Sequence, residues 1–353
     1  MEPIIAPVSL DLIKAELTPN KKLRNTNKSH NEIYIINHHD SPNIMKEIGR
    51  LREEAFRDSG GGSGLAMDID EFDTMEIPYQ QLIVWDPDAE KILGGYRYIL
   101  ASDIKMGEDG QPLLATSHMF HFSDKFIKEY LPYTIELGRS FVSPEYQSSK
   151  AGAKALFALD NLWDGLGALC IINPTMKYFF GKMTMYPEYN RQARDLIQTF
   201  LFKHFEDKDN LVTPMDPLKI ETDKSYMDSI LTESGFKEDY KLLNAEVRRL
   251  GENIPPLVNS YMSLSPTMKT FGGGINHEFS EAEETCILIA FDEIHDAKKA
   301  RHIDSYIEEK IDRIRVRFPL FVENMGDALE EMLANRRARV AKRQEKRAAR
   351  KNK

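Results

Sequence analysis

The spacing of apolar and polar residues divides the chain into short strands and longer amphipathic helices. Runs rich in Ile, Val, Tyr and Phe favour strands, and apolar residues three and four apart favour helices. Strands are predicted over residues 32–37, 81–85, 92–100, 135–142, 177–186, 240–248 and 285–291. Helices are predicted over residues 43–57, 188–206, 226–234 and 256–264, after a cap at Ser148 or Ser149, and from residue 297 onward. This order predicts an α+β fold: a mixed, mostly antiparallel sheet flanked by helices, with a helical basic C-terminal extension.

The strand predicted over residues 135–142 carries two charges, Glu136 and Arg139, in an otherwise apolar segment. A charge in a central strand is unfavourable unless it is paired or used in chemistry. Side chains alternate along a regular strand, so residues three positions apart face opposite sides of the sheet. If both charges serve one site, we therefore predict a β-bulge near Gly138 that re-aims one of them.

A turn of small and polar residues separates this strand from the next helix. It consists of Gln147, Ser148, Ser149, Lys150, Ala151 and Gly152. Its backbone N–H groups are open to close approach by an anion, and Lys150 adds positive charge. The turn suits a phosphate group, and an ordinary capped turn explains the same residues equally well.

Five further charged residues stand in or beside apolar segments: Arg52, Asp68, Asp70, Asp73 and Arg97. Each alone also fits a structural role, as part of a solvated helix face, a solvated loop or an edge strand. A calcium-binding loop is excluded, because the sixth position counted from Asp68 is Asp73 rather than glycine and the twelfth is not glutamate.

Taken in order, these residues form four motifs that resemble the N-acyltransferase branch of the GNAT superfamily. The motifs are Leu51-Arg52 with Phe56, Met67-Asp68-Ile-Asp70-Glu-Phe-Asp73, Gly94-Gly-Tyr-Arg97 and Glu136-Leu-Gly-Arg139-Ser. That branch holds the acyl-homoserine-lactone synthases and, more similar to this chain, the ornithine-lipid and glycine-lipid N-acyltransferases. The resemblance covers roughly residues 33–292 and implies a GNAT-like sheet.

The resemblance implies transfer of a long-chain, 3-hydroxylated acyl group from acyl carrier protein to the amine of an amino acid, in the synthesis of aminolipids of the membrane. Glycine is favoured as the acceptor, with ornithine next. The donor would be an acyl-phosphopantetheine, as acyl carrier protein or coenzyme A thioester, and no cofactor would be bound permanently. An acyl-homoserine-lactone-type signal synthase is the alternative within the same chemistry, and it is less favoured because this chain is far longer than those enzymes.

The resemblance also assigns roles to residues. Glu136 would act as general base, Arg97 or Arg139 would hold the acceptor carboxylate, and Asp70 and Asp73 would orient the arginines or bind the ammonium group. Substrate binding would involve Arg52, Phe56, Asp68, Phe141 and Val142. Gln147 to Gly152 would grip the phosphopantetheine arm, with Asn190 beside the thioester, although Lys150 stands where the family commonly has a glycine.

Charge is distributed unevenly along the chain. Its net charge is −9, yet residues 336–353 hold ten Lys or Arg and one Glu. This segment, Arg336 to Lys353, forms either a solvated helix or a basic surface for an acidic carrier protein and for anionic lipid. A non-catalytic module that binds a carrier protein or nucleic acid is the alternative from another class, and we do not expect nucleic acid to be the partner.

The remaining features define the predicted organisation. Residues 1–30 are expected to form a loosely packed arm, residues 31–292 the acyltransferase domain and residues 293–353 the charged extension. The glycine-rich loop over residues 59–64 predicts a flexible lid or hinge. Two cysteines in apolar runs and the absence of an apolar leader favour a cytoplasmic protein with at most peripheral membrane contact. The histidine pairs lack third ligands at metal spacing, so no metal site is expected.

Overall fold

A computed structural model describes residues 1–147, 152–232 and 235–317 of the chain. Its strands are β1 (Lys22–Asn25), β2 (Glu32–Ile36), β3 (Gln80–Asp86), β4 (Lys91–Leu100), β5 (Phe120–Phe122), β6 (Thr134–Val142), β7 (Tyr178–Met185), β8 (Val212–Pro214), β9 (Lys269–Asn276) and β10 (Ala282–Ala290). Its α-helices are α1 (Leu10–Glu16), α2 (Pro42–Asp58), α3 (Glu71–Thr74), α4 (Gly152–Ile172), α5 (Arg191–Phe205), α6 (Lys224–Ile230), α7 (Phe236–Arg249), α8 (Pro256–Met262), α9 (Asp296–Lys299) and α10 (Ser305–Arg317).

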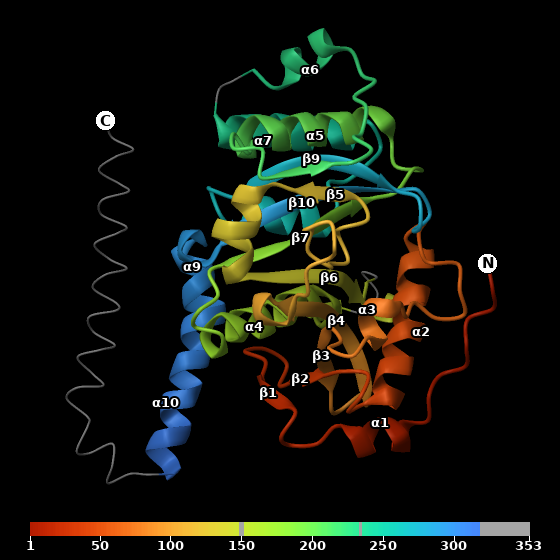
Figure 1. The fold of residues 1–353 in the computed structure, drawn as a ribbon, viewed down its shortest axis with the longest axis vertical. Helices are drawn as coiled ribbons and strands as arrows, with labels where there is room; N and C mark the ends of the chain where they lie inside the picture. The colour runs from red at the N-terminus through yellow and green to blue at the C-terminus, as the bar shows by residue number, and fades with distance from the viewer. Residues whose placement is uncertain (148–151, 233–234, 318–353) are drawn as a thin grey trace.

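The sheet confirms the predicted α+β class. Eight strands follow the order β1-β2-β3-β4-β6-β7-β10-β9, and β5 pairs separately with β8. Neighbouring strands run antiparallel except for β6 and β7, which are parallel and are joined through the crossover helix α4 (Figure 1). The central strand-helix-strand unit thus lies where the apolar pattern predicted it.

Helices and a long connection cover the two faces of the sheet. One face packs against α4, α5 and α8, with α7 lying on α5, and holds the largest apolar core. The opposite face carries two smaller cores, one under α2 and one under the segment from residue 114 to residue 131. Charged side chains of the central strands lie on this second face, so the site described below adjoins both smaller cores.

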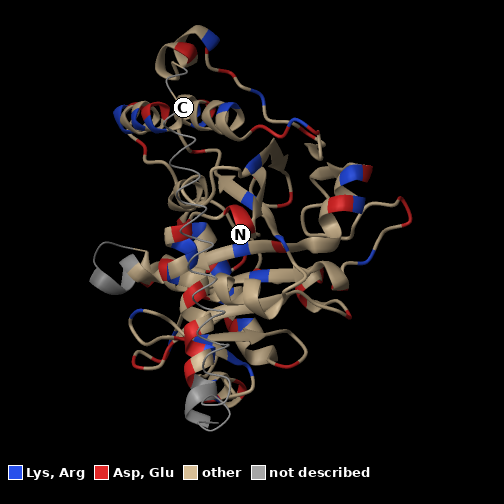
Figure 2. Ribbon diagram, turned by 90° about the vertical axis from the view of Figure 1, so that its left-hand side faces the viewer, with Lys and Arg blue, Asp and Glu red and all other residues tan. Residues whose placement is uncertain are grey.

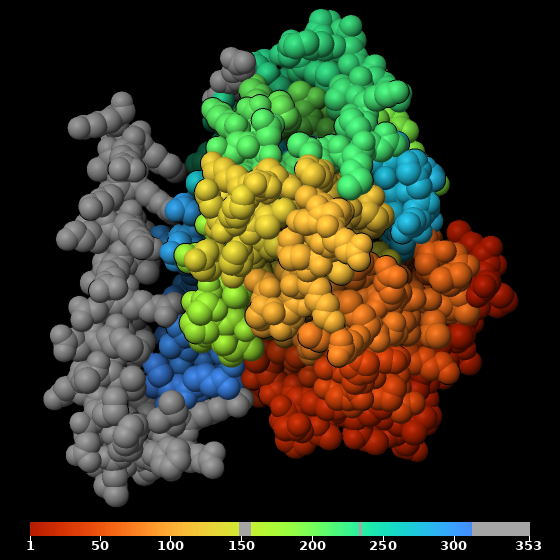
Figure 3. All heavy atoms as spheres, in the orientation of Figure 1, coloured from red at the N-terminus to blue at the C-terminus, as the bar shows by residue number. Residues whose placement is uncertain are grey.

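Several sequence predictions are corrected by the structure. Residues 1–30 are not a loosely packed arm, because α1 contacts α2 and β1 joins the sheet by pairing with β2 (Figure 1). The N-terminal residues, red in Figure 3, lie against the rest of the molecule. The strand predicted over residues 240–248 is helix α7: Leu243 and Val247, four apart, are buried on one face. No strand was predicted just before residue 285, yet the glycines at 272–274 lie inside β9, where a Cβ on Gly273 would lie 2.4 Å from Leu218.

The loop over residues 59–64 is anchored rather than free. Glu53 of α2 accepts hydrogen bonds from the backbone N–H groups of Ser63 and Gly64, each at 2.9 Å. From the far end of the chain, the Ser280 hydroxyl donates to the Gly62 carbonyl at 2.8 Å. These contacts tie the loop to α2 and to the turn between β9 and β10, which contradicts the flexibility predicted for a lid or hinge.

The C-terminal extension is helical through α9 and α10, as predicted, up to residue 317. Both charge signs are interspersed over the helices and connections (Figure 2). The basic segment over residues 336–353 lies outside the described residues. In the described part of the chain, no helix combines the length and the apolar character needed to cross a bilayer.

Close packing of β4 on β6 predicts a strong effect at Gly94. A Cβ at this position would lie 2.4 Å from the Phe141 carbonyl oxygen, a contact that only backbone movement can relieve. We expect Gly94→Ala to destabilise the fold by about 3 kcal/mol, the upper end for overpacked sites. Gly138→Ala is the matched control, because its Cβ would meet Arg97 at an ordinary 3.4 Å. Equal unfolding midpoints of the two variants in urea would contradict this account.

Candidate active site

A β-bulge in β6 brings Glu136 and Arg139 to one site. In the pairing with β4, Gly138 lies opposite Arg97 and Phe141 lies opposite Gly95, so two residues of β6 face the single residue between them. Arg139 within the bulge has a φ of +46°, in the left-handed region. The bulge predicted near Gly138 is confirmed, and both charged side chains line the same cavity.

The cavity opens where β6 and β7 separate. The structure records pairing between these strands only from Thr134 to Glu136 of β6. Beyond this point lies a cavity of about 500 Å³, a size typical of small-molecule sites. One part of its wall is charged, with Arg97, Glu136, Arg139, Lys182 and Glu284. The other part consists mainly of apolar and aromatic side chains next to α4 and α8.

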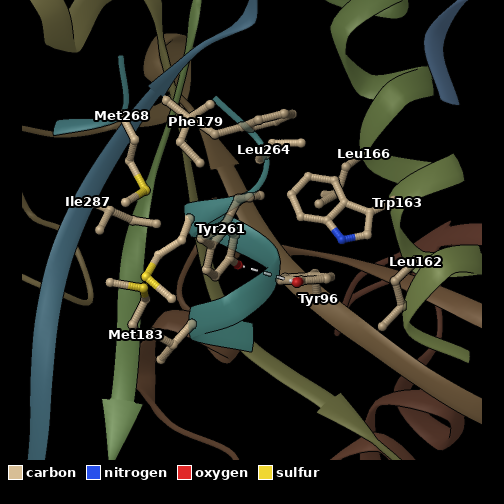
Figure 4. Packing of buried hydrophobic residues seen from close by; sticks show 14 of the residues in the cluster. Tyr96, Leu162, Trp163, Leu166, Phe179, Met183, Tyr261, Leu264, Met268 and Ile287 are labelled. Carbon is tan, nitrogen blue, oxygen red and sulfur yellow. Dashed lines mark hydrogen bonds between the residues drawn. The ribbon is translucent and has the colours of Figure 1, made fainter. Parts of the chain in front are cut away.

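The aromatic part of the wall belongs to the opposite face of the sheet. Tyr96 and Tyr261 pack in the large core under α4, with Trp163 nearby (Figure 4). Their hydroxyl groups lie 3.3 Å apart and form a buried hydrogen bond. Because both faces of the sheet contribute to the wall, the cavity reaches from one face to the other through the gap between β6 and β7.

Glu136 is a buried carboxylate whose hydrogen-bond donors are neutral. Its side chain is 1% exposed and accepts hydrogen bonds from Tyr79 and, at 2.7 Å, from Thr116. Burial raises the pKa of Glu136 above its usual range, and the two hydroxyl donors together with Arg97 and Lys182 offset this only in part. Among the described residues, no ion pair to Glu136 is formed. A carboxylate in this state is suited to accept a proton.

Three arginines and three aspartates form a paired network beside Glu136. Arg97 Nη1 contacts both oxygens of Asp70 at 2.7 Å and Asp73 at 3.3 Å. Arg139 Nε lies 2.9 Å from Asp68. Although burial alone would raise it, the pKa of Asp70 falls to about 2 because of Arg97 and Arg139. The aspartates therefore hold the guanidinium groups of two cavity-lining arginines in place.

Arg52 extends this network behind the cavity wall. Its side chain, 0% exposed, contacts Asp73 at 3.0 Å and donates a hydrogen bond to Gln81. Asp70 caps α3 by accepting from the Asp73 backbone N–H at 3.2 Å. The short helix thus presents its carboxylates to arginines of α2, β4 and β6.

Most of the predicted site residues lie at the cavity or directly behind its wall. Those that line the cavity are Phe56, Arg97, Glu136, Arg139, Phe141, Val142 and Gln147. Those that support the lining arginines from behind are Arg52, Asp68, Asp70 and Asp73. Asn190 does not line the cavity: it caps α5 by accepting from the N–H groups of Gln192 and Ala193. Residues 148–151 lie outside the described residues, and Gly152 begins α4.

The sequence interpretation missed several polar residues of the cavity. Lys182 of β7 forms an ion pair with Glu284 of β10, and both line the cavity. Tyr79 and Thr116 hold Glu136 from segments far from it in sequence. The sequence contained a sign of the Lys182–Glu284 pair, because each of these charged residues interrupts an apolar strand as Glu136 does. Among the described residues, no group of three or more His, Cys, Asp or Glu is placed to hold a metal ion.

Comparisons with known proteins agree with this architecture. Residues 51–156 match a family model described as an acetyltransferase (GNAT) domain. The chain is 64% identical over 316 residues to a glycine N(alpha)-acyltransferase of Phocaeicola vulgatus, covering 90% of this chain and 97% of that protein. It is equally identical, over the same length, to a glycine N(alpha)-acyltransferase of Bacteroides thetaiotaomicron, of which 94% is covered.

Two solved structures show weak similarity. The acyl-homoserine-lactone synthase LasI is 11% identical with a TM-score of 0.35, over 73% of this chain and 90% of that one. The coenzyme A-dependent synthase BjaI is 10% identical with a TM-score of 0.34, over 79% and 89%. The extended identity to the two curated relatives is decisive: the chain belongs to the family of GNAT-type N-acyltransferases that includes these glycine N(alpha)-acyltransferases.

Proposed function

We propose that the protein transfers a long-chain acyl group from a phosphopantetheine thioester to the amino group of glycine. The observation that carries the proposal is Glu136, a buried carboxylate without an ion-pair partner among the described residues, at a cavity that reaches through the sheet. The names of the two relatives support glycine as the acceptor.

The chemistry requires a base, because an amino acid arrives as an ammonium ion that cannot attack a carbonyl. Ionised Glu136 takes one proton from the ammonium group, and the free amine attacks the thioester carbonyl carbon. A C–N bond forms and the carbonyl oxygen becomes an oxyanion. When the oxyanion collapses, the C–S bond breaks, and the thiolate leaves and takes up the second amine proton.

The developing oxyanion needs fixed hydrogen-bond donors. Beyond Glu136, the edge of β6 that faces β7 has backbone groups that pair with no strand in the described part of the chain. Arg97 Nε is buried and has no hydrogen-bond partner among the residues that the structure describes, while Nη1 of the same side chain is held by Asp70. These donors are fixed before substrate binds, so they need no reorganisation during the reaction.

The acyl chain would occupy the apolar part of the cavity. Val142, Leu159 and Leu257 line this part, and the Tyr96–Tyr261 pair offers a polar contact to a 3-hydroxyl group. The donor would be acyl carrier protein or coenzyme A, with residues 147–152 next to the phosphopantetheine arm. The product, an N-acylglycine, would enter the synthesis of aminolipids in the membrane.

A direct assay tests this function. The purified protein is incubated with 3-hydroxypalmitoyl and palmitoyl thioesters of acyl carrier protein or coenzyme A, and with glycine, ornithine or S-adenosylmethionine. Mass spectrometry should detect N-acylglycine as the main product. Acyl-homoserine lactone as the main product would instead establish a signal synthase, and absence of product with every donor would favour a non-catalytic binding module.

The basic tail provides a separate prediction about the donor. Removing residues 336–353 is expected to raise the half-saturating concentration of acyl carrier protein or to release the protein from anionic liposomes. Each Lys or Arg near such a surface contributes about 1 kcal/mol, screened over about 10 Å at ordinary salt. The effect should shrink as salt rises. Equal donor affinity and equal liposome binding of the two forms at low salt would exclude this role.

A further inference from the structure

Lys182 of β7 lies beside Glu136 at the cavity. In the parallel pairing, Glu136 of β6 lies opposite Phe180 of β7. Lys182, two residues farther along β7, therefore projects from the same face of the sheet as Glu136. Both side chains line the cavity, on opposite sides of the gap between the two strands.

The surroundings of Lys182 leave part of its ammonium group available to a ligand. An ammonium carries three N–H donors. Among the described residues, the carboxylate of Glu284 forms an ion pair with it, and the weak acceptor Met119 Sδ lies at 3.8 Å. Glu284 is itself held by Asn276 at 3.0 Å and by Thr184 at 3.2 Å. The pair is thus anchored on the carboxylate side, while the ammonium borders the cavity.

The two arginines of the cavity are held by the aspartate network. Arg97 Nη1 contacts Asp70 and Asp73, and Arg139 lies between Asp68 and the ring of Phe279, 4.5 Å from the ring centroid. Lys182 and Arg97 are also the cations that act on the pKa of Glu136. Glu136, which has no ion-pair partner among the described residues, and the ammonium group of Lys182 therefore face one gap.

We propose that Lys182 binds the carboxylate of the acceptor amino acid while Glu136 receives its ammonium group, and that Glu284 positions Lys182. An α-amino acid carries its two charges on either side of one carbon atom, which matches two opposite charges facing one gap. This inference rests on the proposed function and moves the carboxylate subsite from the arginines to β7.

The test compares glycine with glycinamide, which has the amine but no carboxylate. In the full-length protein, Lys182→Met should lower the ratio of kcat/KM for glycine to that for glycinamide by about 10- to 100-fold, the range for a hydrogen bond to a charged group. Most of the change should lie in KM for glycine. Lys182→Arg should keep part of the preference, because it retains the charge. Lys177→Met, an exposed position just before β7, is the matched control and should leave the ratio unchanged.

Glu284→Gln tests the positioning role. It should raise KM for glycine while keeping more of the preference over glycinamide than Lys182→Met does, because the ammonium is still present. A purely structural pair would instead affect both acceptors equally in both variants, and that result would overturn the proposal. The proposal would also be overturned if Lys182→Met left the ratio of kcat/KM for glycine to that for glycinamide unchanged while Arg139→Gln lowered it strongly. Arg139 would then be the residue that binds the carboxylate. Absence of N-acylglycine from the unmodified protein would refute the proposed function itself.

Discussion

Replacing Glu136 with glutamine is expected to lower kcat/KM for glycine by a hundredfold or more, the range for loss of a general base. Glutamine has nearly the same shape and can still hydrogen-bond to Tyr79 and Thr116, but it cannot take up the proton of the acceptor ammonium. Steady-state rates of N-acylglycine formation at saturating acyl donor measure the effect.

The stability of the Glu136→Gln variant should not fall with its activity. Because burial raises the pKa of Glu136 in the folded protein, its contribution to stability is present below the unfolded pKa and is lost as pH rises through the folded pKa. Glu136→Gln should therefore be at least as stable as the unmodified protein at neutral pH. A variant with lost activity and a strongly lowered melting temperature would point to a structural role instead.

The pH dependence of the reaction follows from the same shift. The base acts only when ionised, so kcat/KM should rise with pH through a pKa above the usual glutamate value of about 4.3. Tyr79→Phe removes a donor that favours the ionised carboxylate and should move this acidic limb to higher pH. An acidic limb at the same pH in both proteins would show that a group other than Glu136 controls it.

Asp73→Asn is expected to destabilise the fold by about 3–5 kcal/mol, the range for removing one partner of a buried ion pair. Asp73 and Arg52 are both 0% exposed and lie 3.0 Å apart. Burial already lowers the pKa of Arg52, and Asp73 is the main group that opposes this shift. Without the carboxylate, the guanidinium keeps Gln81 and a distant Asp68 carbonyl as hydrogen-bond acceptors. Urea unfolding monitored by fluorescence measures the loss.

The double variant Arg52→Met with Asp73→Leu is the control for this interpretation. Replacing both charges with apolar side chains removes the unpaired buried charge, so the double variant should be more stable than Asp73→Asn alone. It should still be impaired in catalysis, because Asp73 also contacts Arg97 at 3.3 Å. If the double variant is the less stable of the two, the ion pair is not the source of the loss.

The spacing of apolar residues predicted the central unit of β6, α4 and β7, because this spacing is continuous along each of these elements. The apolar run of β6, its termination at Ser143-Pro144 and the spacing of α2 are all local properties. The strand predicted over residues 240–248 was wrong, because a short apolar segment fits both the two-residue repeat of a strand and the 3.6-residue repeat of a helix. Packing on α5 makes it the helix α7.

The sequence by itself determined which side chains carry charge within apolar strands, and strand alternation predicted a bulge near Gly138 if Glu136 and Arg139 serve one site. Only the tertiary structure decided which charges meet. Lys182 and Glu284 are about a hundred residues apart and become partners through the register of β7 on β10. Tyr79 and Thr116 reach Glu136 from segments that pack over the same face. Long-range register and packing depend on the whole core, so no local pattern contains them.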